Sequence, residues 1–246
     1  MALDETLLAR AGQGDAPTLR LYGWDGPWLS LGYAQPFSAR ALLACRAAGV
    51  RVVRRVTGGR AVLHGADLTY AVTAPEAALP GSLTASYRVL SAALLRALLA
   101  IGVAAESAPA GPTPSPVDPA RFDCFAEAAA DELAVGGRKL AGSAQRRAGG
   151  ALLQHGSIRL APDPPEAARV AGAGRLATSL DELGVASALA RRRLVTALPE
   201  SLADVLGVAF APAPLTQGER SEALRRTAAL RADPLARRAD PASRAL

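Results

Sequence analysis

Paired glycines next to β-forming segments constrain this fold more than any other feature of the sequence. They occur at 58–59, 136–137 and 149–150, each beside residues that are rich in valine, leucine or isoleucine. Glycine tolerates the positive φ angles of tight turns, so the pairs predict strands that reverse direction within a few residues. A Gly-Pro turn at 26–27 predicts a further hairpin, between strands at 18–24 and 28–34.

Helical signals surround these segments. Ser38 can cap a helix through about residue 48, and the apolar residues of 82–101 recur at helical spacing over the longest such stretch of the chain. Five prolines at 108–119 predict a loop, and short helices are expected from about residue 162. We therefore predict one α+β domain.

The expected domain is an antiparallel-rich sheet flanked by helices. It covers residues 1–232, with a helical end from about 162 and a frayed tail at 233–246.

Composition adds one specific clue. The 28 basic residues include a single lysine, Lys139, so arginine serves wherever only a positive charge is needed. Lysine is a compact point charge on a flexible stem, whereas arginine is a broad planar fork. The isolated lysine is therefore interpreted as functional.

Charge and cysteine content exclude several classes of protein. A net charge of +6 with 4% aromatic residues and no nucleic-acid motif favours an acidic protein partner over nucleic acid. The two cysteines, Cys45 and Cys124, have no CxxC spacing, so we expect neither a disulfide framework nor a metal site. The sequence also shows no export signal and no uninterrupted membrane span, so we expect a cytoplasmic protein.

The residues suited to chemistry lie in three glycine-containing segments. RRVTGGRAVLH places Arg55 and the Gly58–Gly59 turn before His64, GRKLAGSAQRR holds Lys139, and QHGS holds His155. Arginine beside a glycine turn can hold an anion or a polar carbonyl. The only lysine and both histidines of the chain thus fall in the predicted sheet.

These segments, together with WLSLGYAQ, resemble the biotin and lipoate protein ligase superfamily, in order from about Met1 to Leu160. The resemblance implies an α+β fold. Within the superfamily, TGGRAVLH and LTY are most similar to cysteine-dependent octanoyltransferases. RFDCFAEAAADELAVGGRK supplies the Cys-Phe context of that subgroup, with Cys124 fifteen residues before Lys139. One departure is Gly65, which follows His64 where an acidic residue is common.

The resemblance implies a two-step transfer without ATP or another cofactor. Cys124 would take octanoate from octanoyl-acyl carrier protein, with Lys139 lowering the thiol pKa. The lysine of a lipoyl-domain protein, such as the glycine cleavage H protein, would then accept the acyl group. The residues expected to line the acyl pocket are Arg55, Gly58, Gly59, His64, Ser143, Ala144, Gln145 and His155.

Three alternatives remain open. An ATP-dependent lipoate-protein ligase would use Lys139 on lipoate and adenylate, with ATP and Mg²⁺, and Cys124 would be incidental. A cysteine-dependent octanoyl amidotransferase would take its acyl group from another lipoyl domain. A catalytically silent carrier-binding protein would bind without turnover.

Overall fold

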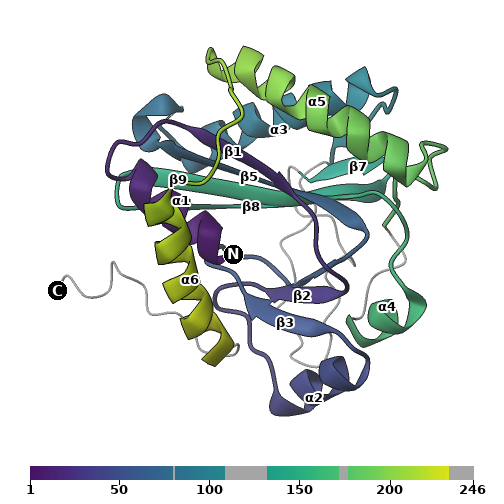
Figure 1. Ribbon diagram of the computed structural model, residues 1–246. Coiled ribbons are helices and arrows are strands. Elements are labelled where there is room, and N and C mark those ends of the chain that lie inside the picture. Colours follow the sequence, from purple (N-terminus) through teal and green to yellow (C-terminus); the bar gives the residue numbers. More distant parts are fainter. Residues whose placement is uncertain (80, 109–131, 172–176, 233–246) are drawn as a thin grey trace.

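Two sheets that face each other form the centre of the structure. The computed structural model describes residues 1–79, 81–108, 132–171 and 177–232 (Figure 1). The larger sheet has six strands in the order β1-β5-β9-β8-β7-β6, and every neighbouring pair in it is antiparallel. Its strands are β1 (Thr18–Tyr22), β5 (Asp67–Pro75), β6 (Glu106–Ser107), β7 (Leu133–Val135), β8 (Arg138–Ala148) and β9 (Ala151–Arg159).

Two of the glycine pairs form hairpin turns in this sheet. Gly136 and Gly137 join β7 to β8 with φ angles of 55° and 72°, and Gly149 and Gly150 join β8 to β9 with φ angles of 60° and 76°. A positive φ at both central residues matches the right-handed twist of the strands. The predicted reversals at these two places are confirmed.

The smaller sheet contains β2 (Trp28–Leu31), β3 (Arg51–Arg54) and β4 (Val62–His64) in the order β3-β2-β4. Its β2 and β3 are parallel and are connected through α2 (Ala39–Ala47), which Ser38 caps as predicted. The expected hairpin at 18–34 is wrong, because β1 pairs with β5 whereas β2 pairs with β3 and β4. The Gly-Pro turn instead leads the chain from one sheet to the other.

Helices cover one face of the larger sheet. Figure 1 shows α3 (Leu83–Ala100) and α5 (Ser187–Leu206) side by side over it. The side chains of β5 alternate, so that Leu68, Tyr70 and Val72 join the apolar core with these helices. Helix α3 is long and apolar enough to cross a membrane, but its buried leucines pack in this core.

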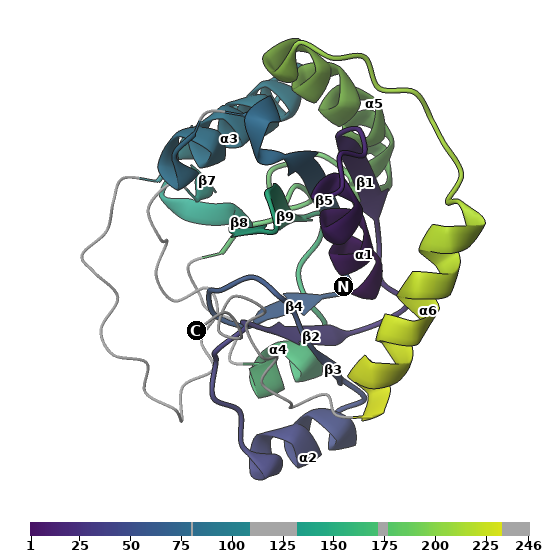
Figure 2. The same cartoon turned by 90° about the vertical axis from the view of Figure 1, so that its left-hand side faces the viewer.

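The other face of the larger sheet looks toward the smaller sheet. Helix α1 (Ala2–Ala11) packs on β5 and β9, and α6 (Gln217–Ala232) packs on α1 (Figure 2). Helix α4 (Pro165–Ala171) contacts α2 and β4 of the smaller sheet, and a 3₁₀ turn (Glu76–Ala78) follows β5. The α+β fold with an antiparallel-rich sheet is confirmed.

The end of the chain differs from expectation in one respect. Residues 187–206 form one continuous helix instead of several short ones. The predicted tail at 233–246 lies outside the described residues, as does the proline-rich stretch after Ala108.

Candidate active site

Lys139 is buried on the face of the larger sheet that looks toward the smaller one. In the β7–β8 pairing, Leu133 lies opposite Ala141 and Ala134 lies opposite Lys139, which leaves Leu140 as an extra residue. Such a bulge changes the face toward which a strand directs its side chains. Leu140 and Ala141 consequently both join the apolar core under the helices, although they are adjacent in sequence.

Glu132 and Gly142 constrain the position of the lysine side chain. The ammonium of Lys139 donates to the carboxylate of Glu132, and both side chains are largely buried. A Cβ at Gly142 would lie only 2.9 Å from Lys139 Cε and 3.0 Å from Nζ. The lysine therefore runs across the backbone of Gly142, and a side chain at that position would require the end of the lysine to move.

Cys124, the expected nucleophile, lies outside the described residues. The borders of its segment are described: Ala108 N–H donates to the carbonyl oxygen of Glu132 over 2.6 Å. The described residues on either side of this segment, Ala108 and Glu132, are therefore in contact next to Lys139. The other cysteine, Cys45, is buried in the core of the smaller sheet, and burial raises the pKa of its thiol.

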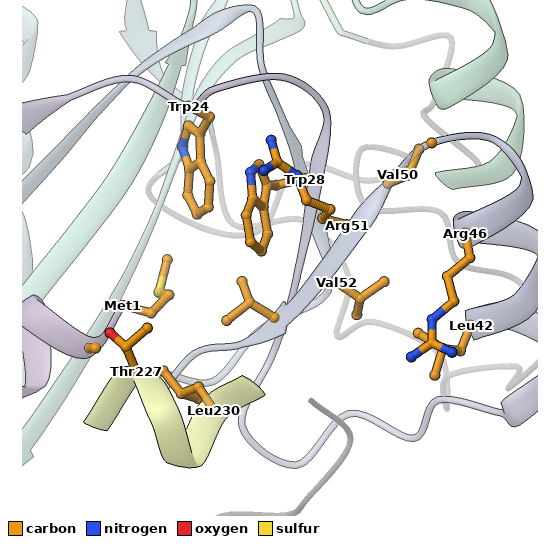
Figure 3. A pocket seen from close by; sticks show the side chains of 13 residues that line it. Met1, Trp24, Trp28, Leu42, Arg46, Val50, Arg51, Val52, Thr227 and Leu230 are labelled. Carbon is orange, nitrogen blue, oxygen red and sulfur yellow. The ribbon is translucent and has the colours of Figure 1, made fainter. Parts of the chain in front are cut away.

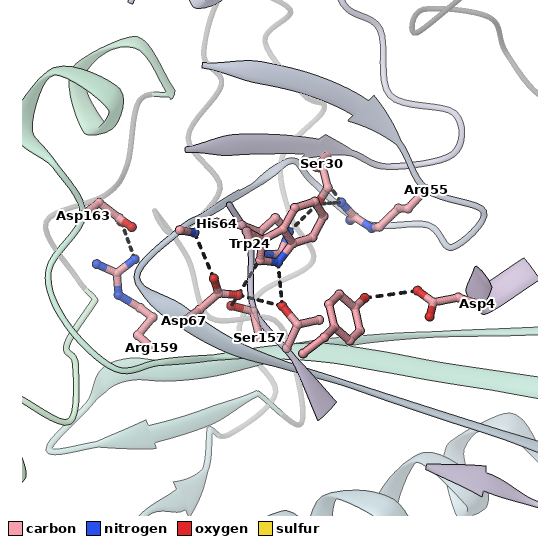
Figure 4. A network of polar contacts seen from close by, with 12 residues as sticks. Asp4, Trp24, Ser30, Arg55, His64, Asp67, Ser157, Arg159 and Asp163 are labelled. Atoms are coloured by element: carbon pink, nitrogen blue, oxygen red, sulfur yellow. Dashed lines mark hydrogen bonds and ion pairs between the residues drawn. The ribbon is translucent and has the colours of Figure 1, made fainter. Parts of the chain in front are cut away.

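His64 ends β4 at the centre of a buried polar network (Figure 4). Its Nε2 lies 2.8 Å from Ser30 Oγ, and its Nδ1 lies 2.8 Å from Asp67 Oδ2. The Trp24 indole stacks on the imidazole, with ring centroids 4.3 Å apart. The histidine is therefore fixed in orientation by a carboxylate on one side and a hydroxyl on the other.

Asp67 is the carboxylate of this network. It also accepts hydrogen bonds from Gly65 N–H and from the hydroxyls of Thr69 and Ser157. Burial alone would raise the pKa of Asp67, but the hydrogen bonds and the charge of His64 lower it to about 2. Asp67 thus supplies a carboxylate to His64 although residue 65 is glycine.

His155 lies in a second network of the same design. Its Nε2 lies 2.6 Å from Thr57 Oγ1, and its Nδ1 lies 3.4 Å from Asp4 Oδ2. Asp4 is fully buried and also binds Arg20 and the hydroxyl of Tyr22. Burial lowers the pKa of His155 and outweighs the opposing effect of Asp4, so the neutral imidazole is favoured.

Arg55 joins the two histidine networks. Its Nη1 donates to the carbonyl and hydroxyl oxygens of Ser30, and its Nε donates to Thr57 Oγ1. Its Nη2 donates to the carbonyl oxygens of Gly58 and Arg60, over 2.7 Å and 2.6 Å. These contacts hold the predicted glycine turn in place. A direct contact of Arg55 with substrate stays a prediction, and the contacts described support an indirect role.

The Gly58–Gly59 turn is packed against the smaller sheet. Gly59 has a φ of 88°. A Cβ at Gly32 would lie 1.8 Å from the carbonyl oxygen of Gly59. Both positions therefore require glycine. The close approach fixes the height of the turn above the sheet.

Residues 143–145 of β8 alternate between the two faces of the larger sheet. Ser143 Oγ lies 2.6 Å from the hydroxyl of Tyr70, and Gln145 donates to Gln154, both on the side of α3. Ala144 lies opposite His155 and shares its face. Of the three expected pocket residues, only Ala144 directs its side chain toward the smaller sheet. A role for the backbone of all three stays a prediction.

Sequence reasoning missed Asp4, Asp67, Glu132 and Trp24. The signal for Asp67 is a charged residue at the start of a strand that is otherwise buried, three residues after His64. Asp4 gives a weaker signal, because acidic residues are common in the first turn of any helix. Trp24 acquires its partners His64 and Thr69 only when distant segments meet. Glu132 instead meets Lys139 across the β7–β8 hairpin, seven residues along the chain.

Comparisons with known proteins agree on one family. The family model of the lipoyl protein ligase A/B catalytic domain matches residues 1–210. The octanoyltransferase LipM of Symbiobacterium thermophilum is 40% identical over 239 residues, which cover 91% of this chain and 87% of that protein. The octanoyltransferase LipM of Kyrpidia tusciae is 39% identical over 241 residues, with coverage of 91% and 88%.

Solved structures show the same fold at lower identity. A lipoate-protein ligase A bound with ATP superposes with a TM-score of 0.74 at 22% identity, over 91% of this chain and 86% of that one. A putative lipoate protein ligase from T. acidophilum with bound lipoic acid gives a TM-score of 0.74 at 23% identity, with the same coverage.

Proposed function

The chain belongs to the family of the lipoyl protein ligase A/B catalytic domain, and we propose that it transfers an octanoyl group to lipoyl-domain proteins in lipoate biosynthesis. The observation that carries this proposal is the identity of about 40% to octanoyltransferases over 91% of the chain. The ligase structures share the fold at 22–23% identity, which does not distinguish the reaction. The protein is accordingly an acyltransferase.

Cys124 is the nucleophile in this proposal. Its thiolate attacks the carbonyl carbon of octanoyl-acyl carrier protein, and the carrier thiolate leaves with the electrons of the broken C–S bond. The amine of an acceptor lysine then attacks the acyl-enzyme, loses its proton, and releases the Cys124 thiolate as the amide forms. One thioester replaces another before the amide forms, so neither step requires ATP or another cofactor.

The position of Lys139 supports this mechanism. Cys124 precedes Glu132 by eight residues in the sequence, and Glu132 contacts the Lys139 ammonium. Eight residues span at most about 29 Å when fully extended, so the sequence keeps Cys124 within that distance of Glu132. An ammonium near the thiol lowers its pKa from about 8.5 and increases the fraction of reactive thiolate.

The partners follow from the same reaction. The donor is octanoyl-acyl carrier protein, and the acceptor is a lipoyl-domain protein such as the glycine cleavage H protein, in the cytoplasm. Carrier domains of this kind are generally acidic, and the net charge of +6 favours their approach. A donor that is itself an octanoylated lipoyl domain is the second candidate.

Intact mass spectrometry tests the proposal. The protein is mixed with octanoyl-acyl carrier protein without ATP, and wild type is compared with Cys124→Ser and Lys139→Ala. Wild type should gain one octanoyl group, the serine variant none, and the alanine variant should acylate more slowly. ATP-driven lipoylation of an acceptor that survives Cys124→Ser would instead establish a ligase.

A competition experiment identifies the donor. Octanoylated H protein and octanoyl-acyl carrier protein are supplied separately, and the rates of Cys124 acylation are compared. Faster labelling by the carrier protein is expected.

A further inference from the structure

A pocket of about 590 Å³ lies along β3, the edge strand of the smaller sheet among the described residues. Figure 3 shows Trp24 and Trp28 on one side of β3, with Leu42 and Arg46 of α2 on the other. Thr227 and Leu230 of α6 close one end. Its volume is within the range of small-molecule sites.

The pocket has one available positive charge. Arg46 is exposed in the last turn of α2, and within the described part of the chain its guanidinium makes no hydrogen bond or ion pair. Arg51, by contrast, is held by two hydrogen bonds to the carboxylate of Asp25 and lies 4.4 Å from the Trp28 ring centroid. A single free guanidinium suits a monoanion, and a carboxylate matches its fork.

The walls of the pocket suit an aliphatic chain. The Trp24 and Trp28 rings are tilted by 48°, with centroids 5.7 Å apart, so no parallel slot for a planar base lies between them. One face of Trp24 already stacks on His64, and Arg51 covers a face of Trp28. Val50, Val52 and Leu42 continue the apolar surface around β3 toward Arg46.

We propose that this pocket binds a medium-chain carboxylate, with the alkyl chain against Trp24, Trp28 and Val52 and the carboxylate on Arg46. Neither Lys139 nor His155 lines this pocket, and binding there does not depend on the transfer reaction. Trp24 connects the pocket to the His64 network, because its indole stacks on His64 and donates to Thr69 Oγ1 over 2.8 Å. A ligand that moves Trp24 thereby changes the surroundings of His64.

Tryptophan fluorescence provides a direct test, because both tryptophans of the chain line the pocket. Cys124→Ser protein is titrated with octanoate, so that acyl transfer through Cys124 does not contribute. A saturable change in fluorescence is expected. Arg46→Gln should weaken binding by roughly tenfold, because it removes a charge-assisted hydrogen bond.

Matched controls separate the pocket from non-specific binding. Arg40→Gln changes an exposed arginine on the same helix that does not line the pocket, and it should bind octanoate like the parent protein. Octanol has the same chain length without the charge, so it should bind less tightly to the parent protein and be insensitive to Arg46→Gln. A fluorescence change that never saturates, or equal octanoate affinity in the parent and Arg46→Gln proteins, would overturn the proposal. Neither result bears on the transfer of octanoate by wild type.

Discussion

Gly142 determines where the Lys139 side chain can lie. The ammonium and Cε of Lys139 occupy the space that a Cβ at residue 142 would need. No other side chain is compatible with this arrangement unless the lysine moves. The glycine therefore acts on the reaction through the lysine and needs no contact with the substrate.

We predict that Gly142→Ala displaces Lys139 and makes Cys124 less reactive at neutral pH. The pH at which iodoacetamide alkylates Cys124 at half its maximal rate should rise toward the value of an ordinary thiol, about 8.5. Alkylation followed by mass spectrometry measures this, and buried Cys45 serves as the internal reference. Gly218→Ala is the control, because a Cβ there meets no atom within 4 Å. An unchanged profile would show that Lys139 does not act on Cys124.

Residue identity alone revealed part of this site. A single lysine among 27 arginines is visible in the sequence, and so are both histidines. The carboxylate that orients His155 is not visible in the same way, because Asp4 is 151 residues from His155 along the chain. A contact between such distant residues depends on the register of the sheet.

At the scale of elements, local patterns predicted strands better than they predicted strand partners. Glycine pairs at 136–137 and 149–150 encode their hairpins locally, because both glycines adopt positive φ. The Gly-Pro turn at 26–27 does not specify which strands pair, and β1 and β2 lie in different sheets. The extra residue Leu140 was equally hidden, since a bulge shows only when β7 is aligned with β8.

The contacts of His155 join β9 to α1 and predict how stability varies with pH. The pKa of His155 is lowered in the folded state, so the unfolded chain takes up its proton first as the pH falls. The contribution of neutral His155 to the free energy of unfolding is fully present above the ordinary histidine pKa of 6.5. It is lost as the pH falls from 6.5 toward the lower pKa that His155 has in the folded protein. Asp67 has a pKa of about 2 in the folded protein, so its contribution to the free energy of unfolding is lost only below the ordinary aspartate pKa of 3.8.

Denaturant unfolding between pH 8 and pH 5 tests this expectation. The free energy of unfolding of wild type should fall below about pH 6.5, which is near the ordinary pKa of histidine. His155→Asn should be less stable than wild type at pH 8 and should show a weaker dependence on pH. Parallel curves for the two proteins would assign the pH dependence to other groups.

At the scale of the molecule, Arg55 connects the two sheets. Through Ser30 it reaches His64 and Asp67, and through Thr57 it reaches His155. Asp67 and His155 belong to the larger sheet, whereas Ser30 and His64 belong to the smaller one. Arg55 thus links the glycine turn to both sheets, in addition to the direct contact between His64 and Asp67.

We therefore predict that Arg55→Lys destabilises the protein by about 1–3 kcal/mol. An ammonium has three donors, whereas the described part of the chain already places five acceptors around Arg55, so buried oxygens would be left unpaired. Unfolding followed by tryptophan fluorescence measures the loss, since Trp24 lies beside His64 between the sheets. Arg96→Lys is the control, because its ion pair with Asp204 is exposed and should contribute less than about 1 kcal/mol. If Arg55→Lys is no less stable than that control, the sheets are held together by their other contacts.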